Sequence, residues 1–399
     1  MHLKRTLSLT LLAFYGLGTI LGAGIYALVG EVAKEAAQFT PLSFLIASII
    51  AFFTAISYAE LSSRLPLSAG SALYVRRAFQ QRWLSGLIGW IVVLTGVISA
   101  ATLSHGFVKY FQLFLPLPPS LIITILVVIL AGVAVWGIRE SATLILFMTL
   151  MEVGGLLMII YYGRYSLASI DIQSFSFPHS FDGVLIGAFI AFYAFIGFED
   201  MVNTAEETIN PEKTLPKAIF LALISATILY VAVAWVIVST IPSNALVKTD
   251  MPLIEIIQLQ GQSPLLFSII ALISITNGIL VQIIMASRLI YGMANQQNAP
   301  QIFSFVYSKT QTPVNSTLLV SLIILLFAYA LPITTLAKLT SSIILCIFII
   351  IHASLIKIKL TEKKTTRGYF IPYCFPDDFH FINPDIFRHT VFFKVDYLF

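Results

Sequence analysis

Charged residues are scarce in this chain of 399 residues. Asp, Glu, Lys and Arg make up 11% of it, whereas soluble domains carry about 25%. So few charges are not enough to cover the surface of a water-soluble protein of this size. Hydrophobic residues reach 58%, and the mean hydropathy is +0.93. The composition therefore excludes a soluble globular domain and predicts a polytopic membrane protein.

Cysteine is also rare, and the motifs of several catalytic and energy-coupling classes are absent. The two cysteines, Cys346 in an apolar run and Cys374 near the end, cannot form a disulfide framework. The sequence has no glycine-rich phosphate loop ending in GKS or GKT, no HExxH, no GxSxG and no TVGYG. These absences argue against an ATP-driven pump, a hydrolytic enzyme and a potassium channel. We predict that the protein is not an enzyme and has neither a catalytic nor a metal site.

Ten apolar runs are long enough to cross a bilayer, which takes about 20 residues of helix. They occupy residues 7–31, 42–63, 84–114, 119–137, 142–163, 183–200, 217–241, 264–294, 314–331 and 333–356. Cationic residues gather in alternate connections, including Arg64, Arg76, Arg77, Arg82 and Arg139. Under the positive-inside rule, this asymmetry predicts that both termini are cytoplasmic. The net charge of +4 then reflects orientation in the bilayer, and no nucleic-acid partner is expected.

Glycines interrupt two of these runs. The first interruption lies within residues 15–27 and contains Gly16, Gly18, Gly22 and Gly24. The second lies in FYAFIGFED, residues 192–200. Glycine costs about 1 kcal/mol in a helix interior. An unpaired backbone group in hydrocarbon costs several kcal/mol, so an opened helix is tolerated only where it lines a cavity or binds a ligand. Paired interruptions in corresponding positions of two halves point to the binding site of a transporter.

The interruptions divide the ten runs into two groups of five. Because five is odd, the second group must enter the membrane from the opposite side. This predicts inverted repeats at residues 1–165 and 170–358, with a ligand site between them near the midplane. A coincidence of two glycine-containing helices is the alternative. Residues 359–399 are predicted to form an atypical cytoplasmic tail, because prolines and aspartates there break every apolar run of spanning length.

Four ordered segments resemble the amino acid-polyamine-organocation (APC) superfamily, specifically its bacterial amino acid permeases. They are GLGTILGAGIYALVG from Gly16, SYAELSSRLPLSAGSALYVRRAF from Ser57, AFYAFIGFEDMVNTAEETINPEKTLPKAI from Ala191 and NGILVQIIMASRLIYGMA from Asn277. The resemblance implies an all-α polytopic fold, a LeuT-like five-plus-five inverted repeat with discontinuous helices 1 and 6, and secondary active transport. Because such permeases usually have twelve helices, we interpret the tail as an altered reading frame or early termination that replaces helices 11 and 12.

An amino acid is a zwitterion, and a broken helix offers it complementary partial charges. Free N–H groups at the new amino terminus favour a carboxylate, and free carbonyls before the break favour an ammonium. We therefore predict that N–H groups around Ala23 and Gly24 bind the carboxylate, and that carbonyls near Ile20 and Ile196 bind the ammonium. The resemblance implies the same positions. Three glycines would let the substrate approach this backbone closely: Gly22, Gly24 and Gly197. The alternative is that these small residues only allow the helices to pack closely.

Five further residues follow from the second interruption. Tyr193 lies one turn before it, where the resemblance implies an aromatic lid over the substrate, with an ordinary packed aromatic as the alternative. The other four are predicted to act in gating: Glu199, Asp200, Glu206 and Glu207. The first two would cap or pair around the re-entering helix rather than carry protons. The last two would join cytoplasmic cations, with solvated loop charges as the alternative.

Glu152 lies in the fifth run, where relatives that use protons often carry a lysine whose ammonium is thought to replace a bound sodium. A charged residue at a helix centre costs about 3 kcal/mol on insertion scales, which makes it a functional-site hypothesis by default. We predict that Glu152 takes up and releases a proton during transport. A permanently protonated, hydrogen-bonded carboxyl group is the alternative. A carboxyl group reverses the charge of the lysine, so the coupling mechanism of those relatives cannot simply be copied.

With no fixed acid or base identified in the pocket, the sequence favours a small or medium neutral amino acid carried together with a proton. Exchange and sodium coupling are alternatives, as are a non-transporting amino acid sensor and a decayed, inactive product. No cofactor is expected. The predicted setting is the plasma (inner) membrane of a bacterium. The lipid bilayer and the amino acid are the expected partners, and self-association into a homo-oligomer is left open.

Overall fold

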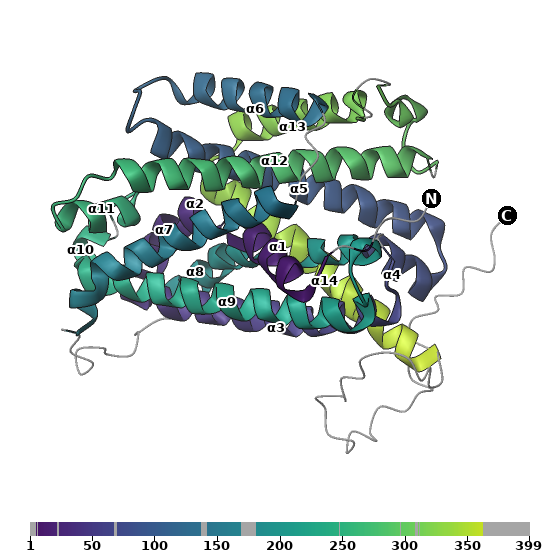
Figure 1. Ribbon diagram of the computed structural model, residues 1–399, viewed down its shortest axis with the longest axis horizontal. Coiled ribbons are helices and arrows are strands. Elements are labelled where there is room, and N and C mark those ends of the chain that lie inside the picture. Colours follow the sequence, from purple (N-terminus) through teal and green to yellow (C-terminus); the bar gives the residue numbers. More distant parts are fainter. Residues whose placement is uncertain are drawn as a thin grey trace, which may run out of the picture.

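The computed structural model describes residues 5, 7–21, 24–67, 70–136, 142–168, 181–246, 248–295, 297–307, 310 and 312–361. These residues form a bundle of helices whose long members lie along a common direction (Figure 1). In chain order the elements are α1 (Leu9–Leu21), α2 (Ile25–Ala36), η1 (Ala37–Phe39), α3 (Thr40–Arg64), α4 (Gly70–Phe79), α5 (Arg82–Phe111), α6 (Pro119–Trp136), α7 (Ala142–Ala168), α8 (Asp182–Phe192), η3 (Tyr193–Phe195), η4 (Phe198–Glu207), α9 (Pro211–Thr240), α10 (Ser243–Leu246), α11 (Pro252–Leu259), α12 (Leu265–Asn295), η5 (Gln301–Ser304), α13 (Val314–Ala330) and α14 (Ile333–Thr361).

The protein is an all-α polytopic membrane protein. Each predicted run overlaps a helical segment, and the first and sixth runs are interrupted, as α1 with α2 and as α8 with η3 and η4. By length and composition, seven helical stretches among the described residues could cross a membrane. The last helix of the described residues, α14, continues to Thr361, so the predicted boundary between residues 358 and 359 falls inside it. The tail beyond residue 361 lies outside the described residues.

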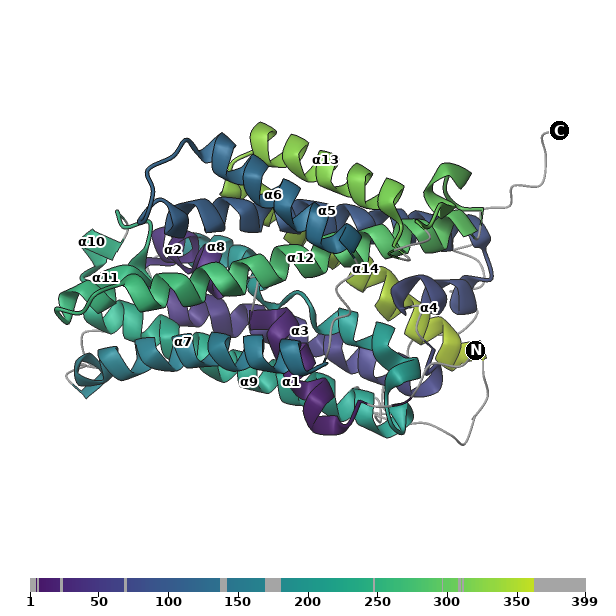
Figure 2. The same cartoon turned by 45° about the horizontal axis from the view of Figure 1, so that its top comes forward.

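The apolar runs do not predict five short elements of the described chain, η1, α4, α10, α11 and η5. Figure 2 and Figure 1 both place α4 at one end of the bundle and α10 and α11 at the opposite end. The helix α4 carries Arg76 and Arg77 in its last turn, where cations favour a helix carboxyl terminus. It is too short to span a bilayer, so its residues were interpreted as part of a connection.

The bundle has large apolar side chains outside and small polar ones inside. Leu322, Leu326 and Ile349 are among the most exposed hydrophobic residues, as expected for surfaces that face lipid. The buried Thr102 and Ser104 each donate a hydrogen bond of 2.8 Å to a carbonyl one turn earlier in α5. Small side chains of this kind let neighbouring helices approach closely, and these two hydroxyl groups have partners within their own helix.

Burial separates the core helices from the peripheral ones. In the most apolar 18 residues of α5, 72% of the residues are buried, and the same share holds for the stretch from α8 into η4. The corresponding share for α6 is 33%. Both views place α6 beside α13 on one flank of the bundle (Figures 1 and 2). The second interruption is therefore at the centre of the protein, where a ligand could be enclosed.

Candidate functional site

The first interruption separates α1 from α2. Helix α1 ends at Leu21 and α2 begins at Ile25, with Gly24 at the N-cap position. Gly24 offers no side-chain cap, so no capping side chain occupies the amino terminus of α2. Gly22 and Ala23, both predicted site residues, lie outside the described residues.

The second interruption separates η3 from η4. Ile196 is extended, with φ −64° and ψ 139°, and Gly197 has φ 124°, a conformation that glycine adopts at little cost. Oε2 of Glu199 accepts a hydrogen bond of 2.8 Å from the N–H group of Gly197, in keeping with a capping role. The chain then forms the 10-residue 3₁₀-helix η4, although such runs rarely exceed about 4 residues.

The two interruptions lie against each other. A Cβ atom placed on Gly24 would be 2.1 Å from Cα of Ala194, and one placed on Gly197 would be 2.7 Å from the carbonyl oxygen of Thr19. Oγ1 of Thr19 also lies 3.1 Å from the carbonyl oxygen of Gly197. Each interruption thus packs a glycine against the backbone of the other, an approach that no larger residue allows.

One hydroxyl group joins both interruptions. Tyr230 of α9 is fully buried, and its hydroxyl oxygen lies 2.8 Å from the carbonyl oxygen of Ile20 and 2.9 Å from that of Ala194. The ring packs edge-on against Phe195, with centroids 5.1 Å apart. Carbonyls at the end of a helix lack partners within it. A single O–H donor shared by two such groups therefore stabilises both and fixes their separation.

Tyr230→Phe is expected to destabilise the pairing of the interruptions. The ring stays, but two buried carbonyl groups lose their shared donor, which costs about 1–3 kcal/mol. The midpoint of thermal unfolding of the purified protein in detergent should fall. Tyr161→Phe is the matched control, because the Tyr161 side chain is exposed on α7. Equal midpoints for the two variants would show that the Tyr230 hydroxyl contributes nothing to this pairing.

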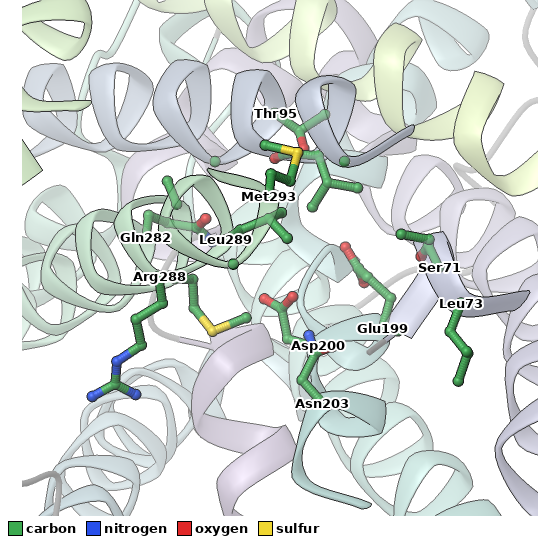
Figure 3. Close-up of a pocket in the computed structure, with 18 of the residues that line it drawn as sticks. Ser71, Leu73, Thr95, Glu199, Asp200, Asn203, Gln282, Arg288, Leu289 and Met293 are labelled. Atoms are coloured by element: carbon green, nitrogen blue, oxygen red, sulfur yellow. The ribbon is translucent and has the colours of Figure 1, made fainter. Parts of the chain in front are cut away.

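A cavity of about 470 Å³ lies beside the second interruption, among α4, α5, η4 and α12. Its wall includes the buried Ser99 and Ile196 and the exposed Arg76 and Arg288, so it leads from the surface to the interruption. Figure 3 shows how its polar and apolar lining residues converge from several elements, among them Ser71, Thr95, Glu199, Asp200, Asn203, Gln282, Leu289 and Met293.

The predicted site residues near the interruptions form two groups. Ile196, Glu199 and Asp200 line the cavity. Four others lie at the interruptions but outside the lining, and they are Ile20, Gly24, Tyr193 and Gly197. The cavity and the paired interruptions are therefore neighbours that share Ile196.

Tyr193 lies directly behind the inner wall of the cavity. Its hydroxyl oxygen is 2.7 Å from Oγ of Ser99 and donates a hydrogen bond of 3.0 Å to the Ser99 carbonyl. Ser99 lines the cavity, and Tyr193 is 1% exposed. The tyrosine thus ties η3 to α5 at the buried end of the cavity, and its role as a lid over the substrate stays a prediction.

The two remaining gating candidates lie at the end of η4. Glu207 is exposed, and its carbonyl accepts a hydrogen bond of 3.0 Å from the N–H group of Leu7. Its side chain forms no ion pair with a described residue. The side chain of Glu206 lies outside the described part of the chain. A backbone hydrogen bond thus connects this segment to the residues just before α1, and the gating role of Glu206 and Glu207 stays a prediction.

Glu152 of α7 is fully buried and lies apart from the cavity lining. Nδ2 of Asn277 donates a hydrogen bond of 3.5 Å to its Oε1, and its Oε2 has no partner among the described residues. Its carbonyl accepts a hydrogen bond of 2.5 Å from the hydroxyl of Tyr26 in α2. An ionised carboxylate here would face no cation in the described structure, and an uncompensated buried charge is strongly unfavourable.

Ion pairs join α2 to its neighbours at the end of the bundle that carries α10 and α11. Nζ of Lys109 lies 2.7 Å from Glu31, Nζ of Lys34 lies 3.5 Å from the same carboxylate, and Lys338 pairs with Glu35 at 3.6 Å. Lys34 also donates to Asp250 and lowers the pKa of that carboxyl group. Because that pKa is lowered, this contact persists at neutral pH and is lost as the pH falls through the lowered value.

Sequence reasoning missed three residues that organise the site: Tyr230, Ser99 and Asn203. Tyr230 and Ser99 are ordinary residues of apolar helices whose partners lie in distant elements. Asn203 lies in the segment from Ala191 that the family resemblance had already marked, three residues after Asp200. Within the described residues, no group of three or more His, Cys, Asp and Glu side chains is placed to hold a metal ion. The arrangement offers uncapped backbone groups, two cavity carboxylates and a separate buried carboxyl group.

The chain is similar to known membrane transport proteins over most of its length. Residues 5–377 match a family model described as amino acid permease. The chain is 30% identical to the branched-chain amino acid permease BcaP of Bacillus subtilis over 93% of this chain and 84% of that protein. It is 30% identical to the mitochondrial cationic amino acid transporter 3 of Arabidopsis thaliana, over 90% and 63% of the two chains. It is also 28% identical to the methylthioribose transporter of Bacillus subtilis, over 93% and 85%. The chain thus spans most of the bacterial relatives and less than two thirds of the plant one.

Proposed function

The chain belongs to the amino acid permease family, and we propose that it is a secondary active transporter that moves amino acids by alternating access. The family consists of transport proteins, and the protein is not an enzyme. The observation that carries the proposal is the reciprocal contact of the two helix interruptions next to a cavity. The cavity reaches the surface at the α4 end, while ion pairs hold α2 at the other end. A site accessible from one side at a time is what alternating access requires.

Backbone groups at the interruptions bind the zwitterion in this proposal. The amino terminus of α2, at Gly24 and the preceding Ala23, receives the carboxylate, because helix amino termini favour anions. Carbonyls of Ile20 and Ile196 receive the ammonium. Tyr230 already donates to the Ile20 carbonyl, but a carbonyl oxygen has two lone pairs and can accept a second donor.

Coupling is proposed to use a proton on Glu152. Its support is the fully buried carboxyl group with one unpartnered oxygen and no cationic neighbour among the described residues. Tyr26 connects the backbone of α7 at this residue to α2, which begins at the first interruption. Protonation or deprotonation of Glu152 would therefore affect the position of α2, the half-helix that binds the substrate carboxylate in this proposal. Exchange and sodium coupling are the competing modes.

The helices are proposed to form two inverted repeats, α1 to α7 and α8 to α14, as the paired interruptions suggest. Both termini are proposed to lie on the cytoplasmic side of a plasma membrane, which puts the mouth of the cavity at Arg76 and Arg288 on that side. Glu199 and Asp200 are proposed to cap or pair around the re-entering helix at the inner gate, and Glu206 and Glu207 are proposed to join cytoplasmic cations there. Self-association into a homo-oligomer stays an open prediction.

Reconstituted proteoliposomes test the transport proposal. Purified protein should give saturable uptake of labelled amino acids that responds to an imposed pH gradient and is absent from empty vesicles. Binding without flux would instead support a sensor that kept the site. The names of the relatives include branched-chain amino acids, cationic amino acids and methylthioribose as substrates. Family membership alone therefore does not identify which amino acid this protein transports.

A further inference from the structure

Two consecutive carboxylates line the cavity directly after the second interruption. Glu199 is already engaged, since its Oε2 accepts the hydrogen bond of 2.8 Å from Gly197. The side chain of Asp200 has no hydrogen-bond or ion-pair partner among the described residues, and only its N–H group is used, in a bond of 3.2 Å to the Gly197 carbonyl. Figure 3 shows both carboxylates directed into the cavity, with Asn203 beside Asp200.

The cations of the cavity wall do not neutralise these acids. Arg76 and Arg288 also line the cavity, but both are exposed, and neither pairs with Asp200. In Figure 3 the guanidinium group of Arg288 extends away from the two carboxylates. A half-buried carboxylate without a partner is unfavourable, and a positive charge delivered by a ligand would relieve it.

The cavity is large enough to admit such a ligand. Its 470 Å³ lies within the range of about 300–1,000 Å³ that small-molecule sites occupy. The carboxylate of an amino acid would be repelled by Glu199 and Asp200, so it must point away from them, towards the amino terminus of α2. A side chain that starts at the interruption near Ile196 then extends along the cavity towards Asp200.

We propose that Asp200 is a specificity-determining residue that selects amino acids with a positively charged side chain, with Asn203 as an additional acceptor. This inference rests on the proposed transport function and concerns the same site. It replaces the expectation of a neutral cargo, which depended on finding no fixed acid in the pocket. Glu199 holds the interruption, and Asp200 holds the cationic end of the substrate.

The test compares lysine or arginine with leucine in proteoliposomes held at one pH and one membrane potential. The unmodified protein should take up the cationic amino acids with a higher kcat/KM than leucine. Asp200→Asn should lower kcat/KM for lysine by roughly tenfold, because a charged partner in a half-buried site is replaced by a neutral one. The ratio of kcat/KM for lysine to kcat/KM for leucine should therefore fall in that variant. Asp200→Glu, which restores the charge, should recover most of the lysine uptake.

Glu212→Gln is the matched control, since it removes one carboxylate from an exposed position at the start of α9, outside the cavity. It should leave both substrates unaffected. The thermal midpoint of each purified variant, with and without lysine, separates loss of binding from loss of folding. The inference is overturned if the unmodified protein takes up leucine faster than lysine and Asp200→Asn changes neither rate. That result would still be consistent with the proposed transport function. Folded protein that carries no amino acid of any class overturns the transport function itself.

Discussion

Replacing Glu152 by glutamine is expected to abolish pH-driven uptake and to leave substrate binding intact. Glutamine has nearly the same size, and its carbonyl oxygen can still accept the hydrogen bond from Asn277, so the packing around α7 should survive. What the variant loses is the ability to bind and release a proton. The groups that face Glu152 are Tyr26, Tyr230 and Asn277. A tyrosine has an ordinary pKa of about 10 and an amide does not titrate, so none of them replaces Glu152 as a proton carrier near neutral pH.

The measurement is uptake into proteoliposomes with and without an inward proton gradient, together with substrate binding to detergent-purified protein. In the glutamine variant, accumulation above equilibrium should vanish, while counterflow and binding persist. Glu152→Asp keeps the carboxyl group and should retain part of the pH response. A glutamine variant with the same pH dependence as the unmodified protein would exclude Glu152 as the proton carrier and leave sodium coupling or exchange.

Gly24→Ala is expected to have the largest effect on assembly of the site. The added Cβ would lie 2.1 Å from Cα and 2.3 Å from Cβ of Ala194. Cα is a backbone atom that cannot swing aside like the end of a flexible side chain. Either α2 or η3 must therefore move, and overpacking of this kind costs about 1–3 kcal/mol or more. Transport should be lost, and the midpoint of thermal unfolding should fall.

Gly132→Ala in α6 is the matched control for this substitution. No atom lies within 4 Å of the Cβ that it would add. Alanine is favoured over glycine in a helix by about 1 kcal/mol, so this variant should be as stable as the parent or slightly more so. If Gly24→Ala transports at the rate of the Gly132→Ala variant, the close contact between the interruptions is not needed for function.

The apolar runs and glycine positions were sufficient to predict the long helices and both interruptions, but not the short helices between them. The reason is that a bilayer is spanned by long apolar helices, and a break in such a helix leaves backbone groups unpaired at a cost of several kcal/mol unless it lines a cavity or binds a ligand. The pairing of Gly24 with Ala194, and of Tyr230 with Ile20, could not be predicted in the same way. Those contacts join segments far apart in the chain, and neither Ala194 nor Tyr230 differs locally from an ordinary residue of an apolar helix.

The cavity illustrates a second limit. Glu199 and Asp200 were identified as polar residues after the interruption, yet consecutive residues in a 3₁₀-helix can point in different directions. Only the structure shows that both line one cavity with residues of α4, α5 and α12. The short helix α4 contributes the exposed Arg76, and it was missed because a 10-residue element gives no spanning signal.

The ion pairs around α2 have a consequence for the medium that bathes that end of the protein. Lys34 with Asp250 and Lys338 with Glu35 are partly exposed, so dissolved salt weakens them, with a screening length of about 10 Å at 0.1 M. The contact of Lys109 with Glu31 is more sheltered, because the Glu31 side chain is 8% exposed. Rising ionic strength should therefore weaken the two partly exposed ion pairs first and the contact of Lys109 with Glu31 last. Salinity would then influence how often this end opens, independently of how much substrate is present.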